Sequence, residues 1–225
     1  MTRGMIRCMI RRMNRRRLLA ALALLPLAPL AAQAQAPITL TPQDQADLAR
    51  IEAYLNSIHT LKARFLQVAP NGQQSEGTVW LDRPGRMRFQ YDPPSPLLLV
   101  ADHGMLVFHD AALNQTSEIP LDSTPLGILL AEKVQLQGSG AAVIAFHHVP
   151  GVIQVTLIRT GRAGQGNLTL VFADNPITLR RWIVVDAQRR QTQVSLFDVQ
   201  LGGSFPESLF VYVDPKTGQP VNGGR

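Results

Sequence analysis

The stretch Asp82–Pro96, DRPGRMRFQYDPPSP, decides the fold class. Its apolar residues Met87, Phe89 and Tyr91 alternate with polar ones, an Arg-Pro-Gly sequence precedes them, and prolines follow. Strict alternation of this kind is typical of a strand in an antiparallel sheet with one apolar face. The sequence therefore predicts such a strand and raises the question of what its apolar face contacts.

The turn before this strand predicts a pairing register. If Pro84-Gly85 is the centre of a two-residue hairpin turn, counting back sets Trp80 opposite Phe89. A shift of one residue would move every side chain to the other face. The register predicts a shared apolar face formed by Trp80, Met87, Phe89 and Tyr91.

Segments with the same two-residue period fill most of the remaining chain, each bounded by Pro, Gly, Asp or Asn. About ten or eleven strands with two or three short helices predict one large, strongly curved antiparallel sheet or an incomplete barrel. The segments from which these strands are expected are 61–69, 75–82, 86–91, 97–101, 104–110, 114–119, 142–149, 151–160, 167–173, 177–186, 189–201 and 210–214.

Two segments have helical features. Thr41 followed by Pro42 is typical of a helix start, and apolar residues at helical spacing predict an amphipathic helix that ends near Ser57. In the segment 123–133, Ser123 can cap a second, short helix that is apolar on nearly every side and must therefore be covered on more than one face. Its central residues are Pro125, Leu126, Ile128, Leu129 and Leu130.

The N-terminus has the pattern of an export signal. Residues 1–34 contain seven arginines and no acidic residue, followed by an apolar run and the small residues Ala32-Gln33-Ala34. We expect a signal peptide over 1–34, with cleavage after Ala36 as the second choice, and a single domain over 35–225. Prolines interrupt the apolar run, which is too short for a membrane span. General and twin-arginine export both fit, as do starts at Met1 and Met13.

Removing this segment changes the charge and cysteine arguments. Of 22 lysines and arginines, seven leave with residues 1–34, so 15 face 16 acidic residues and the mature chain is about neutral. A nucleic-acid partner inferred from net charge is therefore excluded. The single cysteine, Cys8, leaves as well, which excludes a disulfide or a thiol nucleophile in the mature protein.

The sequence offers little for catalysis. It has no GxSxG, HExxH or phosphate-binding loop. The pair His147-His148 cannot jointly hold a metal, because strand neighbours point to opposite faces; we expect one buried and one exposed ring. The chain is thus expected to be no enzyme and to hold no metal or cofactor.

The ordered motifs resemble the LolA family of periplasmic lipoprotein carriers over essentially the whole mature chain. They are F-x-Q at Phe65–Gln67, GTVWLDRPGRMRF at Gly77–Phe89, YDPP at Tyr91–Pro94, LLVADHGMLVFHD at Leu98–Asp110, TPLGILLA at Thr124–Ala131 and FVYVDP at Phe210–Pro215.

This resemblance implies an unclosed barrel of about eleven strands with an α-helical lid. Its apolar cavity holds acyl chains, and Trp80, Met87, Phe89 and Tyr91 are the expected lining. Arg83 matches the family arginine that latches the lid, with expected partners in a helix such as Thr124–Ala131. Met87 stands where well-studied members have phenylalanine.

The implied partners are acylated lipoproteins, an inner-membrane lipoprotein-releasing ABC complex and an outer-membrane lipoprotein receptor, with the chain a soluble periplasmic monomer. Two alternatives stay open: a periplasmic sensor of lipid or lipoprotein on the same half-barrel, and a periplasmic hydrolase without a recognisable motif.

Overall fold

A computed structural model of the chain describes residues 37–138 and 140–221. The predicted signal peptide lies outside these residues. Within the described residues, no helix combines the length and apolar character needed to cross a membrane.

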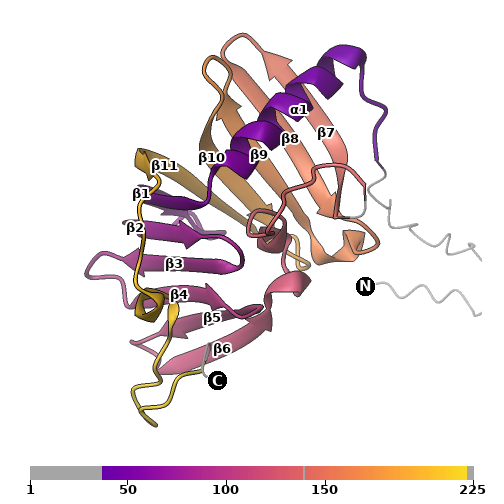
Figure 1. Ribbon diagram of the computed structural model, residues 1–225. Helices are drawn as coiled ribbons and strands as arrows, with labels where there is room; N and C mark the ends of the chain where they lie inside the picture. The colour runs from indigo at the N-terminus through magenta and orange to yellow at the C-terminus, as the bar shows by residue number, and fades with distance from the viewer. Residues whose placement is uncertain (1–36, 139, 222–225) are drawn as a thin grey trace, which may run out of the picture. The chain divides into compact units, whose positions relative to one another are not determined.

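The described chain is built on one antiparallel sheet of eleven strands (Figure 1). Its spatial order is β6-β5-β4-β3-β2-β1-β11-β10-β9-β8-β7. The bounds are β1 Thr60–Val68, β2 Gln74–Asp82, β3 Arg86–Tyr91, β4 Leu97–Asp102, β5 Met105–Asp110, β6 Gln115–Pro120, β7 Ala141–Val149, β8 Val152–Arg159, β9 Asn167–Ala173, β10 Thr178–Val185 and β11 Gln191–Leu201.

The sheet is curved but not closed. In a flat sheet, β3 and β10 would lie about 19 Å apart, four spacings of about 4.8 Å. The rings of Phe89 on β3 and Trp182 on β10 nevertheless have centroids 6.1 Å apart, so the sheet bends around the face that carries them. We call this the concave face. The edge strands β6 and β7 do not pair, which confirms the predicted fold class of a mainly β, unclosed eleven-stranded sheet.

Helix α1, Pro42–Ser57, has the predicted bounds. Thr41 caps it, and Asp44 completes a reciprocal capping box. Its apolar stripe is buried on the concave face, where Tyr54 meets Phe172 of β9 edge to face at 6.2 Å. The Tyr54 hydroxyl also accepts a hydrogen bond from the backbone N–H of Leu179 on β10, at 3.1 Å. One helix therefore covers the half of the sheet nearest to β7.

The predicted register of the β2–β3 hairpin is wrong by one residue. Asp82 pairs with Arg86, so the loop has three residues and ends on Gly85, whose φ is +75°. Three-residue hairpin loops commonly place glycine in this left-handed conformation. Trp80 therefore pairs with Arg88 on the convex face, where the Lys62 ammonium lies 5.9 Å from the centroid of the Trp80 ring.

The segment 121–140 joins the two edge strands. The predicted α-helix at 123–133 is replaced by two short 3-10 helices, η1 Leu121–Ser123 and η2 Pro125–Ile128. An added Cβ at Gly127 would lie 2.1 Å from Nη2 of Arg159 and 2.8 Å from the carbonyl oxygen of Leu121. The side chains of Leu129 and Leu130 are buried in the main core. We call residues 121–140 the connector.

The predicted final strand at 210–214 is also wrong. Phe210 ends a 3-10 helix, η4 Glu207–Phe210, and Val213 forms only an isolated bridge with Pro220. Tyr212 instead packs on Val100 and Val107 of the convex face in a small second core. The alternating pattern thus reflects a segment with one buried side rather than a sheet partner.

The two adjacent histidines of β7 differ from the prediction. Their pairing places them on opposite faces, but both are exposed, because they lie near the end of an edge strand. His148 reaches α1: its Nδ1 lies 2.8 Å from Oδ2 of Asp47, and its Nε2 lies 3.2 Å from Oδ2 of Asp174. Arg50 also bridges these two carboxylates, at 2.8 and 3.1 Å. This cluster joins α1 to β7 and to the β9–β10 turn.

We expect the stability of the protein to fall as pH rises through neutrality because of His148. Both ring nitrogens can donate to carboxylates only in the imidazolium form. Hydrogen bonds to Asp174 and then Asp47 raise the pKa of His148 against the effect of desolvation. A raised folded-state pKa gives a contribution that is complete below the ordinary pKa of about 6.5 and is lost as pH rises through the folded value. The measurement is the melting temperature from about pH 6 to pH 8.5.

The control for this prediction is the neighbouring ring. His148→Gln should abolish this part of the pH dependence, whereas His147→Gln should leave it intact. The same pH dependence in His148→Gln as in the wild-type protein would contradict the proposed protonation.

Candidate functional site

The concave face contains an apolar cavity of about 220 Å³. Strands from both halves of the sheet supply its walls, and Leu126 of the connector covers it. The lining residues are Gln67, Phe89, Tyr91, Leu99, Phe108, Leu126, Trp182, Val184, Thr192 and Val194.

Aromatic packing holds one wall of the cavity. Phe65 is fully buried, and its ring centroid lies 4.8 Å from that of Phe89 and 5.1 Å from that of Tyr91. A Cβ at Gly77 would lie 2.7 Å from carbons of the Phe65 ring, so a glycine at this position leaves the space that the ring occupies. Edge-on contacts of this kind favour one arrangement of the rings. The wall is therefore ordered before any ligand arrives.

One polar contact lies within this wall. The Tyr91 hydroxyl donates to Oε1 of Gln67 at 2.8 Å. Burial raises the pKa of Tyr91 to about 12, although the hydrogen bond with Gln67 acts in the opposite direction. Tyr91 therefore remains a neutral phenol at physiological pH, and the cavity gains no charge from it.

The structure distributes the four predicted lining residues unevenly. Phe89 and Tyr91 line the cavity, and Met87 is fully buried on the same face. Trp80 lies on the opposite face because of the one-residue register error. Sequence reasoning missed the other walls, although all of them lie within the predicted strands 61–69, 97–101, 104–110, 177–186 and 189–201. The residues missed are Gln67, Leu99, Phe108, Trp182, Val184, Thr192 and Val194.

Two contacts tie the covering elements to the β2–β3 loop. The guanidinium of Arg83 donates from Nη1 to the carbonyl oxygen of Leu55, in the last turn of α1. The expected partners of Arg83 were in the connector, but the connector meets this loop through a backbone hydrogen bond, from the N–H of Gly85 to the carbonyl of Leu130 at 2.9 Å. The loop thus contacts both α1 and the connector. Asn56 and Glu52 of α1 form further hydrogen bonds with the connector.

The environment of Arg83 is costly for a cation. Burial lowers the pKa of its guanidinium to about 10. Its Nε and Nη2 atoms are buried and have no hydrogen-bond partner among the described residues. Burying donors without partners offsets part of the gain from the bond to Leu55. The net stabilisation that Arg83 gives to the contact with α1 is therefore the difference between one hydrogen bond gained and two donors left unpaired.

The part of the chain that the structure describes contains no group of three or more His, Cys, Asp or Glu side chains arranged to hold a metal ion. The mainly apolar lining of the cavity suits the binding of an apolar molecule.

The family model described as outer membrane lipoprotein carrier protein LolA matches residues 56–213. The chain is 26% identical to the outer-membrane lipoprotein carrier protein of Chromohalobacter salexigens over 207 residues, which cover 87% of this chain and 96% of the relative. The corresponding protein of Dechloromonas aromatica is 26% identical over 181 residues, covering 74% and 83%.

A solved structure, that of the LolA superfamily protein NE2245 from Nitrosomonas europaea, aligns with a TM-score of 0.41 at 9% identity, covering 76% of this chain and 98% of that one. The family match spans more than half of the chain, and it includes β1 to β11 and the residues that line the cavity. The chain therefore belongs to the LolA family of outer membrane lipoprotein carrier proteins.

Proposed function

We propose that this protein is a periplasmic, non-enzymatic carrier that binds the acyl chains of lipoproteins in the cavity of its concave face. The observation that carries the proposal is an apolar cavity on the concave face, with Leu126 of the connector as part of its lining. The carrier receives its cargo from an inner-membrane releasing complex of the ABC type and delivers it to an outer-membrane receptor. It acts as a monomer in the periplasm, which it reaches by means of the predicted signal peptide.

The physical need for such a carrier follows from the hydrophobic effect. Each methylene group exposed to water costs about 0.8 kcal/mol, so one long acyl chain costs on the order of 10 kcal/mol. A lipoprotein crossing an aqueous compartment must therefore hide its chains. The aromatic and aliphatic walls around Phe89 and Trp182 offer the required apolar surface.

The size of the cavity indicates that it must enlarge. Its volume of about 220 Å³ lies below the range of about 300–1,000 Å³ that is typical for sites holding drug-sized ligands. Leu126 forms part of its lining, so displacing the connector enlarges the cavity directly. Binding then shifts the balance between a covered empty form and an open loaded form.

A quenching experiment tests the proposal with the two tryptophans of the chain. Trp182 lines the cavity, whereas Trp80 lies on the convex face. In Trp80→Phe, a lipopeptide with brominated acyl chains should quench the remaining fluorescence strongly. In the matched variant Trp182→Phe, the same ligand should have little effect on Trp80.

The outcomes are distinct. Equal quenching in the two variants would show adsorption to the surface and would refute carriage in the cavity. Recovery of the intact lipopeptide after incubation supports a carrier, and recovery of deacylated product would instead identify a hydrolase.

A further inference from the structure

The concave face changes from apolar to polar along its strands. Near the β2–β3 loop its inward-facing side chains are aliphatic, and toward the β1–β2 and β10–β11 turns they become amides and hydroxyls. The inward series read Leu61-Ala63-Phe65-Gln67 along β1, Leu81-Val79-Gly77-Ser75 along β2 and Leu196-Val194-Thr192 along β11.

The apolar end is covered. Both contacts of the β2–β3 loop, Arg83 with Leu55 and Gly85 with Leu130, lie at this end. The side chains of Leu55, Leu130 and Met87 are at most 1% exposed. A ligand's polar groups would find neither water nor a hydrogen-bond partner among these aliphatic side chains; the unpaired donors at this end are those of Arg83, whose side chain already donates to Leu55.

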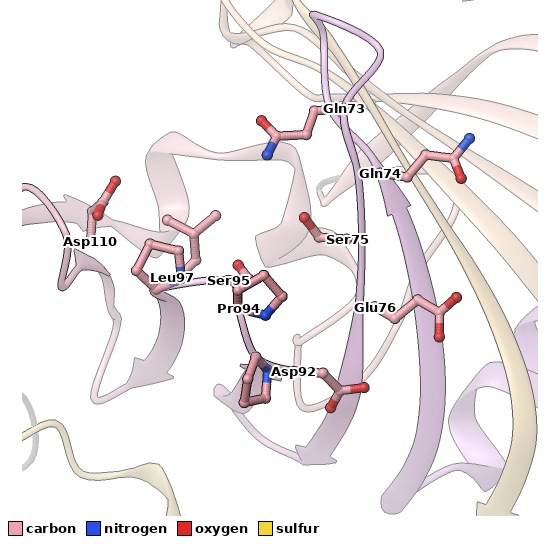
Figure 2. Close-up of a pocket in the computed structure, with 11 residues that line it drawn as sticks. Gln73, Gln74, Ser75, Glu76, Asp92, Pro94, Ser95, Leu97 and Asp110 are labelled. Atoms are coloured by element: carbon pink, nitrogen blue, oxygen red, sulfur yellow. The ribbon is translucent and has the colours of Figure 1, made fainter.

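A groove of about 550 Å³ lies at this polar end, where Ser75 of the inward series is one of its lining residues (Figure 2). Strand β3 ends at Tyr91, opposite Gly77, so residues 74–76 of β2 extend past it. The groove lies between this projecting part of β2 and the loop 92–97. Figure 2 shows Gln73 and Ser75 on the side of β2 that faces Leu97 and Asp110, and Gln74 and Glu76 on the other side.

The acidic groups of the groove already have partners. Arg64 donates from Nη1 to Oδ1 of Asp92 at 3.1 Å and forms an ion pair with Glu76 at 3.6 Å. Asp110 accepts from the backbone N–H groups of Ala112 and Leu113. The remaining lining consists of amides, hydroxyls, prolines and Leu97, which suits a polypeptide better than a free cation.

We infer that a bound acyl chain has a fixed direction: its terminal methyl points toward Met87, its ester carbonyl lies at Gln67 and Thr192, and the attached polypeptide leaves through the groove between β2 and the loop 92–97. This inference rests on the proposed carrier function and specifies the orientation of the cargo.

The donors for the carbonyl lie at the change in polarity. Gln67 uses its Oε1 to accept from Tyr91, which leaves its side-chain NH₂ to donate. Thr192 lines the same cavity and carries a hydroxyl. An ester carbonyl removed from water requires such a donor, whereas methylene groups require none. The polar group of the ligand and the polar residues of the wall are thus brought together.

Two photo-crosslinking lipopeptides test the direction. Each is an S-diacylglyceryl-cysteinyl peptide; one carries a benzophenone two residues after the cysteine, and the other a diazirine at the terminal carbon of an acyl chain. Peptide mapping of the mature protein should find the benzophenone on residues 73–76 and 92–97. The diazirine should label Met87 and its neighbours Leu81 and Leu130.

The outcomes separate this inference from the proposed function. A reversed pattern, or benzophenone label spread equally over both ends of the strands, overturns the orientation. A diazirine probe that labels no residue of the concave face contradicts carriage itself.

A second test addresses the carbonyl contact. The double variant Gln67→Leu/Thr192→Val should lose about 3- to 10-fold in affinity for the ester-linked lipopeptide and much less for its dialkyl ether analogue. Any general damage to the cavity lowers the affinity for both ligands, so the ratio of the two affinities is independent of it. Gln193→Leu, on the convex face beside Thr192, is the matched control and should change neither affinity. Equal losses for ester and ether would overturn the assignment.

Phosphatidylglycerol tests whether the ester carbonyl is recognised when no polypeptide is attached to the lipid. It has the same diacylglyceryl esters but no polypeptide. The same preference for ester over ether in this phospholipid supports a contact with the carbonyl alone. If this phospholipid shows no preference for ester over ether, the carbonyl is not recognised by itself, and the carbonyl assignment is overturned.

Discussion

Arg83→Leu should load with lipoprotein normally, bind an apolar dye more strongly than wild type when empty, and release its cargo poorly to the receptor. The substitution removes the charge-assisted hydrogen bond to the carbonyl of Leu55 at the end of α1. Such a bond contributes about 1.5–3 kcal/mol. Because the unpaired Nε and Nη2 donors of Arg83 offset part of this gain, the open form, with α1 released from the β2–β3 loop, gains at most about ten- to a hundredfold in population relative to the covered form. Dye fluorescence of the empty protein and the rate of transfer to receptor-bearing vesicles measure the two effects.

Two further variants interpret this result. Arg83→Lys should restore the wild-type behaviour only in part, because an ammonium lacks the planar fork of the guanidinium. Arg86→Leu is the matched control, since Arg86 belongs to the same hairpin but pairs with Asp82 at 2.7 Å, away from α1. If Arg83→Leu bound no additional dye and released cargo at the wild-type rate, Arg83 would not hold α1 over the concave face.

Phe89→Asp should reduce the affinity for lipopeptide by at least about a hundredfold. The Phe89 ring is only 3% exposed and contacts both Phe65 and Trp182. A carboxylate in this position has no cationic partner among the lining residues and must lose its water when an acyl chain enters. The corresponding penalty is at least about 3 kcal/mol, or a hundredfold in the dissociation constant. Titration of a fluorescent lipopeptide gives the affinity.

The neighbouring residue provides the control for this substitution. Gln90 is exposed on the opposite face of the same strand, so Gln90→Asp should bind lipopeptide with nearly wild-type affinity. The serine in Phe89→Ser is polar but uncharged, so the affinity of this variant for lipopeptide should lie between those of Phe89→Asp and Gln90→Asp. It shows the effect of lost packing without an added charge. Equal losses at positions 89 and 90 would refute the assignment of the concave face to cargo.

Local signals in the sequence were sufficient to predict most elements. Thr41 and Pro42 define the start of α1 because a side-chain acceptor and a preset backbone angle act within one turn. The alternation of Met87, Phe89 and Tyr91 similarly predicts both the strand and its buried face. Each of these features depends on contacts between residues close in sequence or on a simple period.

Features that depend on a choice between similar geometries could not be predicted. Pro84-Gly85 fits the centre of a two-residue turn as well as the end of a three-residue loop, and this difference alone moved Trp80 to the convex face. The partner of Arg83 depends on where α1 ends relative to the β2–β3 loop, which no local pattern encodes. Likewise, Trp182 meets Phe89 only because the sheet bends, and the curvature is a property of all eleven strands.

The order of the strands has a mechanical consequence for the cover. Strands β6 and β7 are consecutive in sequence but form opposite edges of the sheet, so the connector 121–140 is anchored to both edges. Twenty residues can extend to about 66 Å at about 3.3 Å per residue, and the connector uses part of this length in short helical turns. Any change in the distance between the two edges must therefore be taken up by the connector. The curvature of the sheet and the cover of the cavity are linked through one continuous segment of the chain.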